Sequence, residues 1–255
     1  MRPDDMLTII TATYNSASTI RDTLDSVVQQ KSIPGELLIV DGGSTDETLS
    51  IVESFKKKLP IRILFGPDNG IYDAMNKGLR HAKGDIIGFL NSDDILACDR
   101  CIEDIELLFK KTATDIVYAD LVYVSATDIN KITRRWISGT YTKAKLNTGW
   151  CMPHPAFYIQ RNVFKQIGEF NLDYDLAADY DFICRCLLSD KFKVEYLNKV
   201  VVKMREGGAT SKNIRNVIKQ NIQILNSVRN RKHYTNITMF ILRKLFLKVS
   251  QRLLK

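Results

Sequence analysis

The sequence lacks the long apolar runs that anchor or export a protein. No window approaches the roughly 18 uninterrupted apolar residues of a membrane-spanning helix. The first apolar run follows two acidic residues, is only a few residues long and has no small-residue cleavage pattern behind it, so a secretory signal is not expected. We therefore expect a cytoplasmic globular protein. Its 255 residues, 45% of them hydrophobic and 26% charged, can bury one large core or two modest ones.

Cysteine is scarce and odd in number, with five residues at positions 98, 101, 151, 184 and 186. In a cytoplasmic chain we interpret them as reduced thiols and not as a disulfide framework. Cys98 and Cys101 have the spacing of metal ligands, but no second pair and no spaced histidine pair completes a set of four. Core or surface thiols are therefore the favoured interpretation.

Acidic residues are absent after Glu206, where eleven basic residues follow. Because the whole chain carries +8, this leaves a net charge of −3 for residues 1–206. From Ile214 onward, apolar residues recur at helical spacing. They form two rows: Val217, Ile218, Ile222, Leu225 and Val228, and then Leu242, Leu245, Phe246, Val249 and Leu253.

An amphipathic helix whose only charges are lysine and arginine binds anionic bilayer surfaces. We therefore expect the basic tail, residues 207–255, to attach peripherally to the inner membrane face. The alternative is a helix packed on the rest of the chain or on a second subunit of a homodimer. Nucleic acid is not an expected partner, because the basic residues lack interleaved aromatics.

The first 95 residues alternate short apolar strands with helices, without an internal repeat. We expect strands at 7–12, within 36–41, at 61–65 and at 85–90. A helix capped by Ser18 or Thr19 follows the first strand, a second lies within 44–58, and a third begins near Ile71. Repeated strand-loop-helix units predict an α/β fold with a mostly parallel sheet.

The second half, residues 96–206, is less regular. The pattern predicts a helix at 99–111, a strand within 114–124, and irregular chain from there to Pro155. A strand, a short helix, a loop and a longer helix starting near Asp179 should follow. No linker separates the halves, so we expect one compact unit with two functional lobes.

All four early strands end in polar or acidic loops, and the carboxyl ends of parallel strands hold ligands. That places Asn15, Asp41, Asp68 and Asp93 around one crevice. Clustered carboxylates would repel an anionic ligand unless a cation intervened. Oxygen ligands such as Asp93 suit Mg²⁺ or Mn²⁺, which bind phosphate oxygens. Taken alone, the Asp93 and Asp94 pair is also typical of a turn or helix cap.

Three segments in this order resemble family 2 glycosyltransferases of the GT-A fold. They are TIITATYN at 8–15, LLIVDGGSTDET at 37–48 and FLNSDD at 89–94. The resemblance covers roughly residues 7–205, and the combination is far more specific than each piece. It implies a Rossmann-like sheet flanked by helices and a metal-dependent enzyme that uses a UDP- or GDP-sugar as donor.

The resemblance also implies a set of donor-binding residues. These are Thr11, Thr13, Tyr14, Asn15, Asp41, Gly42, Asp68, Asn69, Asp73, Lys77, Asn91, Ser92 and His154. Within it, Asp41 hydrogen-bonds the nucleobase, while Lys77 neutralises phosphate and Asp73 orients it. An i, i+4 ion pair is the alternative for Asp73 and Lys77. For His154, which is flanked by prolines, the alternative to a donor or acceptor contact is a buried structural role.

The metal motif of the family has two acids flanking one residue, whereas this chain has Asn91, Ser92 and Asp93. By the resemblance Asp93 is the metal ligand, and Asn91 holds a ribose hydroxyl or a water near the metal. The segment DLAADYDFICRCLL at 175–188 resembles the motif that supplies the catalytic base. Here the base assignment falls on Asp179, and Asp181 is expected to point elsewhere.

These residues predict an inverting hexosyltransferase that moves a sugar onto a saccharide or lipid-linked saccharide acceptor. The expected setting is polysaccharide or glycoconjugate assembly, such as capsule, exopolysaccharide or O-antigen. Residues 1–95 would form the donor half and residues 96–206 the acceptor and catalytic half. A non-catalytic nucleotide-sugar binder is the alternative. A nucleotidyltransferase is less favoured, because TATYNSAST after the first strand is neither Gly-rich nor basic.

Overall fold

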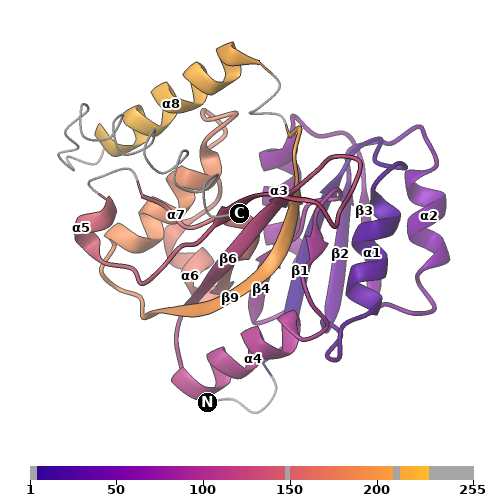
Figure 1. Cartoon of the computed structure of the whole chain (residues 1–255), viewed down its shortest axis with the longest axis horizontal. Helices are drawn as coiled ribbons and strands as arrows, with labels where there is room; N and C mark the ends of the chain where they lie inside the picture. The colour runs from indigo at the N-terminus through magenta and orange to yellow at the C-terminus, as the bar shows by residue number, and fades with distance from the viewer. Residues whose placement is uncertain (1–4, 147–149, 209–212, 230–255) are drawn as a thin grey trace.

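The computed structural model describes residues 5–146, 150–208 and 213–229. Within these residues nine strands form a single sheet (Figure 1). The strands are β1 (Leu7–Thr13), β2 (Glu36–Asp41), β3 (Ile61–Phe65), β4 (Ile86–Phe89), β5 (Ile95–Leu96), β6 (Ile116–Val124), β7 (Ile132–Trp136), β8 (Phe157–Gln160) and β9 (Val194–Arg205).

Helices connect and cover these strands. They are α1 (Ile20–Val28), α2 (Thr48–Ser54), α3 (Ile71–His81), α4 (Cys101–Thr112), α5 (Lys143–Leu146), α6 (Arg161–Ile167), α7 (Ala178–Leu188) and α8 (Ile214–Arg229), with a short 3-10 turn η1 (His154–Ala156). Among the described residues no helix combines the length and apolar character needed to cross a bilayer.

The first half of the sheet has the predicted parallel arrangement. The strand order begins β3-β2-β1-β4, and these three neighbouring pairs are all parallel. The strands are parallel because a helix carries the chain back across the sheet between them. All four carboxyl ends consequently meet at one edge, as expected from the sequence.

The second half of the sheet is mixed. β8 pairs antiparallel with both β4 and β6, and β6 pairs in parallel with β9. The strand at β7 lies in a stretch predicted to be irregular, and β9 was not predicted at all. β9 is mostly half-buried and its pairing with β6 is interrupted by register shifts near Asp120. The sequence of β9 therefore shows no clear alternation of apolar and polar residues.

Two apolar clusters lie on opposite faces of the sheet. One joins the strands to α1, α2 and α4, and the other joins them to α3, α6 and α7. Gly78 of α3 sits so close to β1 that an added Cβ would lie 2.5 Å from Cγ2 of Ile10. In Figure 1 α8 lies above α7, away from α1 and α2. The architecture is the expected α/β fold.

Candidate active site

The loop after β1 is tied to the loop after β2. Asn15 has a left-handed backbone with φ of 48°, which asparagine tolerates better than most residues. Its backbone N–H donates to Oγ of Ser44 at 2.8 Å, and its Oδ1 accepts from the backbone N–H of Thr45 at 2.9 Å. The two loops therefore form one wall of the strand-end edge, from which Tyr14 projects with 64% of its surface exposed.

Asp41, the last residue of β2, is completely buried. Its Oδ1 accepts from the backbone N–H groups of Gly43 at 3.0 Å and Ser44 at 2.7 Å, and its Oδ2 accepts from the Ser44 hydroxyl at 2.6 Å. An ionised carboxylate offers about four acceptor sites. The three bonds fix the carboxylate and leave capacity for one more donor. Ser44 was not among the predicted site residues.

Gly42 allows the loop after β3 to approach. A Cβ on Gly42 would lie 2.5 Å from Oδ2 of Asp68, so any larger side chain would push the Asp68 carboxylate away. Asp68 is half-buried, and its Oδ1 accepts from the backbone N–H of Gly70 at 3.0 Å. Asp41 and Asp68 thus belong to adjoining loops, as predicted.

Asp73 and Lys77 form the i, i+4 ion pair that was the alternative expectation, with Nζ and Oδ2 3.5 Å apart. Asp73 also accepts from the backbone N–H of Asn69 at 3.0 Å, and Lys77 donates to the carbonyl of Pro67. The Asn69 hydrogen bond, aided by the Lys77 charge, lowers the pKa of Asp73. Both side chains therefore brace the start of α3.

The segment after β4 carries the predicted metal motif. The hydroxyls of Ser92 and Ser16 lie 2.9 Å apart, which joins this segment to the loop after β1. Nδ2 of Asn91 donates to Oδ2 of Asp94 at 2.8 Å. Oδ1 of Asn91 is buried and has no hydrogen-bond partner in the described part of the chain. A buried carbonyl oxygen of this kind is costly unless a ligand or water occupies it.

Arg205, at the end of β9, fastens this segment from the second half. Its Nε donates to the Asp93 carbonyl at 3.0 Å, its backbone N–H donates to Oδ1 of Asp94 at 3.3 Å, and its guanidinium pairs with Asp22 of α1. Burial raises the pKa of Asp93. Burial and then the Asp93 charge raise the pKa of Asp94 well above its ordinary value. Sequence reasoning missed Arg205, because the strand that carries it, β9, was not predicted.

These groups fit a hard divalent cation. The half-buried Asp93 carboxylate and the orphaned Asn91 oxygen are both oxygen donors. Across the described residues, no group of three or more His, Cys, Asp or Glu side chains could hold a metal without further ligands. Mg²⁺ commonly takes one or two carboxylates and completes its shell with substrate phosphates and water. The site therefore suits a cation that arrives with a phosphorylated ligand.

Asp179, the second residue of α7, faces α3. The hydroxyl of Tyr72 donates to its Oδ1 at 2.9 Å, although 107 positions separate the two in the chain. Burial and then the Asp179 charge raise the pKa of Tyr72 well above its usual value, so Tyr72 stays a neutral donor. Tyr72 was not predicted; an aromatic in the first turn of α3 was its only signal.

Asp181 points elsewhere, as expected. It is buried, and its carboxylate accepts from Nε of Arg185 at 2.9 Å and from the hydroxyl of Ser227 at 2.7 Å. It therefore anchors α8 to α7.

His154 is buried against Phe89 and Phe170, with ring centroids 4.7 and 5.5 Å away. Burial lowers its pKa, and the charge of Asp179 opposes that shift. Nε2 of this neutral ring is buried and lacks a partner among the described residues. The packing of the ring agrees with a buried structural role for His154. The unpartnered Nε2 agrees with a contact to the donor or the acceptor.

The two halves of the candidate site lie at the same end of the sheet. Tyr72, which bonds Asp179, lies in the first turn of α3, and α3 begins just after the loop at the carboxyl end of β3. Thr11 and Thr13 of β1 are buried, and their hydroxyls lack protein partners within the described ranges. This end of the sheet therefore combines polar atoms that lack a protein partner with the carboxylates of Asp41, Asp93 and Asp179.

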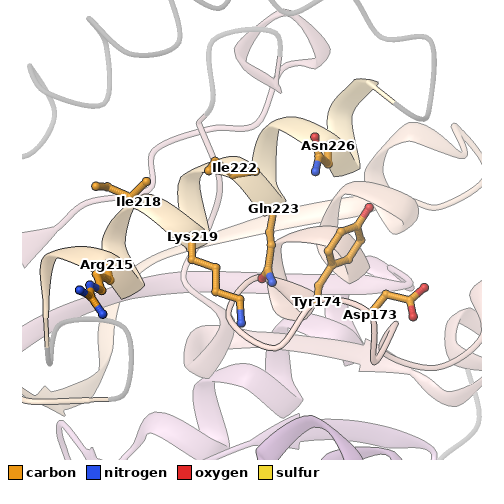
Figure 2. A pocket seen from close by; sticks show the side chains of 8 residues that line it. All are labelled: Asp173, Tyr174, Arg215, Ile218, Lys219, Ile222, Gln223 and Asn226. Carbon is orange, nitrogen blue, oxygen red and sulfur yellow. The ribbon is translucent and has the colours of Figure 1, made fainter.

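A separate open groove of about 490 Å³ runs between α8 and the loop before α7. Figure 2 shows its lining side chains, among them Tyr174, Lys219 and Gln223. None of the residues predicted to bind the donor lines it.

Known proteins resemble this chain in sequence. A sequence model described as Glycosyl transferase family 2 matches residues 8–168. A PGL/p-HBAD biosynthesis glycosyltransferase of Mycobacterium bovis is 34% identical over 212 residues, which cover 82% of this chain and 80% of that protein.

Solved structures share the fold at lower identity. S. aureus TarS 1–349 in complex with UDP-GlcNAc superposes with a TM-score of 0.65 at 19% identity, over 88% of this chain and 72% of that one. The chain spans only 40% of another S. aureus TarS structure. The mannosyltransferase PcManGT from Pyrobaculum calidifontis, in complex with GDP-Man and Mn²⁺, gives 0.64 at 18% identity, over 87% and 64% of the two chains.

Proposed function

We propose, on the premise that this chain belongs to glycosyl transferase family 2, that it moves a sugar from a nucleoside-diphosphate donor to an acceptor hydroxyl with inversion. The observation that carries the proposal is that Asp41 and Asp93 follow or end strands that are both parallel to β1, while Asp179 bonds Tyr72 at the start of α3. All three therefore belong to the end of the sheet at which the parallel strands finish. In this division of labour residues 1–95 bind the donor, and residues 96–206 supply the acceptor side.

The donor would lie across the loops after β1 and β2. Asp41 has room for one further hydrogen bond, which suits an imide or amino N–H of a nucleobase. The exposed ring of Tyr14 offers a surface for the base, whereas the hydroxyls of Thr11 and Thr13 lie buried beneath it in β1. Neighbouring structures contain UDP-GlcNAc and GDP-Man, which supports a UDP- or GDP-sugar.

The diphosphate would lie beside the segment after β4. Asp93 and Oδ1 of Asn91 would hold Mg²⁺ or Mn²⁺, and the PcManGT complex with Mn²⁺ supports this choice. A bound cation supplies positive charge that stabilises the departing diphosphate. Hydrogen bonds from Arg205 to the Asp93 carbonyl and the Asp94 carboxylate hold this segment in place.

Asp179 would act as the general base. The Tyr72 hydroxyl occupies Oδ1 and fixes the carboxylate plane, which leaves Oδ2 to accept the proton of the acceptor hydroxyl. The acceptor oxygen attacks the anomeric carbon as the bond to the diphosphate breaks on the opposite face. A single displacement of this kind inverts the configuration.

The acceptor would be a saccharide or lipid-linked saccharide in polysaccharide or glycoconjugate assembly. The name of the M. bovis relative, a PGL/p-HBAD biosynthesis glycosyltransferase, supports a glycoconjugate setting.

The test begins with a thermal-shift panel of UDP- and GDP-sugars in the presence of Mn²⁺. A donor at a hundred times its dissociation constant stabilises the fold by about 2.7 kcal/mol. With the best donor, Asp179→Asn should lower kcat for donor turnover about 10²- to 10⁴-fold. EDTA should abolish turnover in wild type.

The matched control is Asp173→Asn, an exposed carboxylate in the loop before α7, which should turn over like wild type. Full activity of Asp179→Asn would refute its role as base. Donor binding without any turnover in wild type, with metal and a panel of acceptors, would refute the transferase proposal.

We further propose that α8 rests on an anionic membrane surface. Ile214, Ile218 and Ile222 form an exposed row, with 78%, 54% and 52% of their surfaces accessible. Arg215 is the next residue after Ile214, and α8 has no acidic residue, whereas Lys219 points toward the loop before α7 (Figure 2) and pairs with Asp175. A row of exposed apolar side chains on a helix whose own charges are all positive complements anionic headgroups and acyl chains.

The structure divides the first predicted apolar row, because Leu225 packs toward the core whereas Ile218 and Ile222 face outward. The second predicted row, at 242–253, lies outside the described residues. Replacing Ile218 and Ile222 together by Gln should reduce co-sedimentation with phosphatidylglycerol vesicles but leave the weak binding to phosphatidylcholine unchanged. Leu107→Gln, which alters an exposed leucine on α4, is the control. Equal binding by both variants would reject α8 as the contact.

A further inference from the structure

Two cysteines face each other at the junction of β5 and α4. Cys98 follows β5, Cys101 is the first residue of α4, and their sulfur atoms lie 2.9 Å apart. A covalent disulfide spans about 2.05 Å, so closure needs a movement of about 0.9 Å. We propose that this pair is a reversible dithiol site that low-molecular-weight disulfides, such as oxidised glutathione, convert to an intramolecular disulfide.

The surroundings make the two sulfurs unequal. Cys101 is completely buried, and burial together with the hydrogen bond to Cys98 raises the pKa of the Cys101 thiol to about 12. Cys98 is half-buried, so a disulfide in solution can reach its sulfur. Partial exposure favours reaction of a cysteine with such a reagent. Cys98 is therefore the attacking residue, and Cys101 reacts second.

The local backbone already holds the pair in place. The backbone N–H of Cys98 donates to Sγ of Cys101 at 3.3 Å, and the Cys98 carbonyl accepts from Nε2 of Gln30. On the other side, Oδ2 of Asp104 pairs with Lys199. The segment after α1 and the pairing of α4 with β9 thus hold this turn, and the two sulfurs stay adjacent.

Metal binding does not account for the pair. Throughout the described ranges there is no cluster of three or more His, Cys, Asp or Glu side chains that could hold an ion, whereas a structural zinc site takes four such ligands. The proposed glycosyl transfer uses neither thiol, so the dithiol site does not depend on that reaction.

The oxidation proceeds by thiol-disulfide exchange. The Cys98 thiolate attacks one sulfur of oxidised glutathione, the glutathione S–S bond breaks, and one glutathione thiolate leaves. The Cys101 sulfur then attacks Sγ of Cys98 in the mixed disulfide, and the second glutathione leaves. Two electrons pass from the cysteines to glutathione disulfide, and the two thiol protons end on the two glutathione molecules.

The test equilibrates the full chain with glutathione at graded ratios of reduced to oxidised form, quenches by alkylation and maps the products by mass spectrometry. Wild type should yield a 98–101 disulfide that reduced glutathione reverses. Cys101→Ser should instead accumulate glutathione on Cys98, and Cys98→Ser should leave Cys101 alkylatable.

Cys151→Ser, which alters the other half-buried cysteine, is the matched control and should behave as wild type. Absence of the 98–101 disulfide at the most oxidising ratio, with the circular dichroism of the folded protein retained, would overturn the proposal. So would equal alkylation rates of Cys98 and Cys101 in wild type, a measurement that holds even if a serine variant fails to fold.

Discussion

The hydroxyl of Tyr72 offers a direct test of how the candidate base is held. Tyr72→Phe removes the 2.9 Å hydrogen bond to Asp179 but keeps the ring, whose centroid lies 5.7 Å from that of Phe170. A hydrogen bond to a charged group contributes about 1.5–3 kcal/mol, and each 1.4 kcal/mol is tenfold in rate. If the bond orients Asp179 for proton transfer, kcat/KM should fall about 10- to 150-fold.

The pH profile separates orientation from simple stabilisation of the fold. The raised pKa of Tyr72 keeps its hydroxyl protonated throughout an assay range, so the donor is present at every pH of the assay and the loss in kcat/KM should be similar across pH. Initial rates of nucleoside-diphosphate release, measured across pH with the best donor of the thermal-shift panel, report this loss.

Tyr141→Phe is the matched control, because its hydroxyl bonds the Leu187 carbonyl at 3.3 Å in another part of the second half. It should change Tm slightly and leave kcat/KM unchanged at every pH. A Tyr72→Phe enzyme with a lower Tm but unchanged kcat/KM across pH would refute the orienting role.

Three further changes probe the same end of the sheet. Gly42→Ala would press a Cβ against Asp68 and should weaken donor affinity roughly tenfold by calorimetry; unchanged affinity would contradict the close approach. Asn91→Asp should lower the metal concentration for half-maximal activity, and it should also lower the Tm without metal, because Asp94 loses its amide donor. A higher metal requirement together with a higher Tm would count against a metal-binding role for position 91. Burial lowers the pKa of His154, so only the unfolded chain gains a proton as pH falls below about 6.5. Stability should therefore drop on acidification, and His154→Phe should lose less Tm between neutral and mildly acidic pH than wild type does.

The sequence predicted the first half of the fold well. Apolar runs ending in polar loops indicated β1 to β4, because buried parallel strands read as short continuous apolar segments. The placement of Asp41 and Asp68 in adjoining loops followed from the parallel order alone.

The second half was harder to predict, because its contacts join residues far apart in the chain. Tyr72 meets Asp179, and Arg205 meets Asp22 and Asp93, and no local period encodes such pairs. β9 escaped prediction because its half-buried side chains and shifted register hide the alternation of a strand. The division of α8 into a buried and an outward face likewise depends on where α7 lies.

The antiparallel β8 has a consequence for how the chain reaches its native state. As the protein leaves the ribosome, β1 to β4 can assemble early, but the open side of β4 waits for Phe157–Gln160. Until then Ile86–Phe89 presents unpaired N–H and C=O groups on an entirely apolar strand. Nascent chains that stall before β8 are therefore prone to pair with one another.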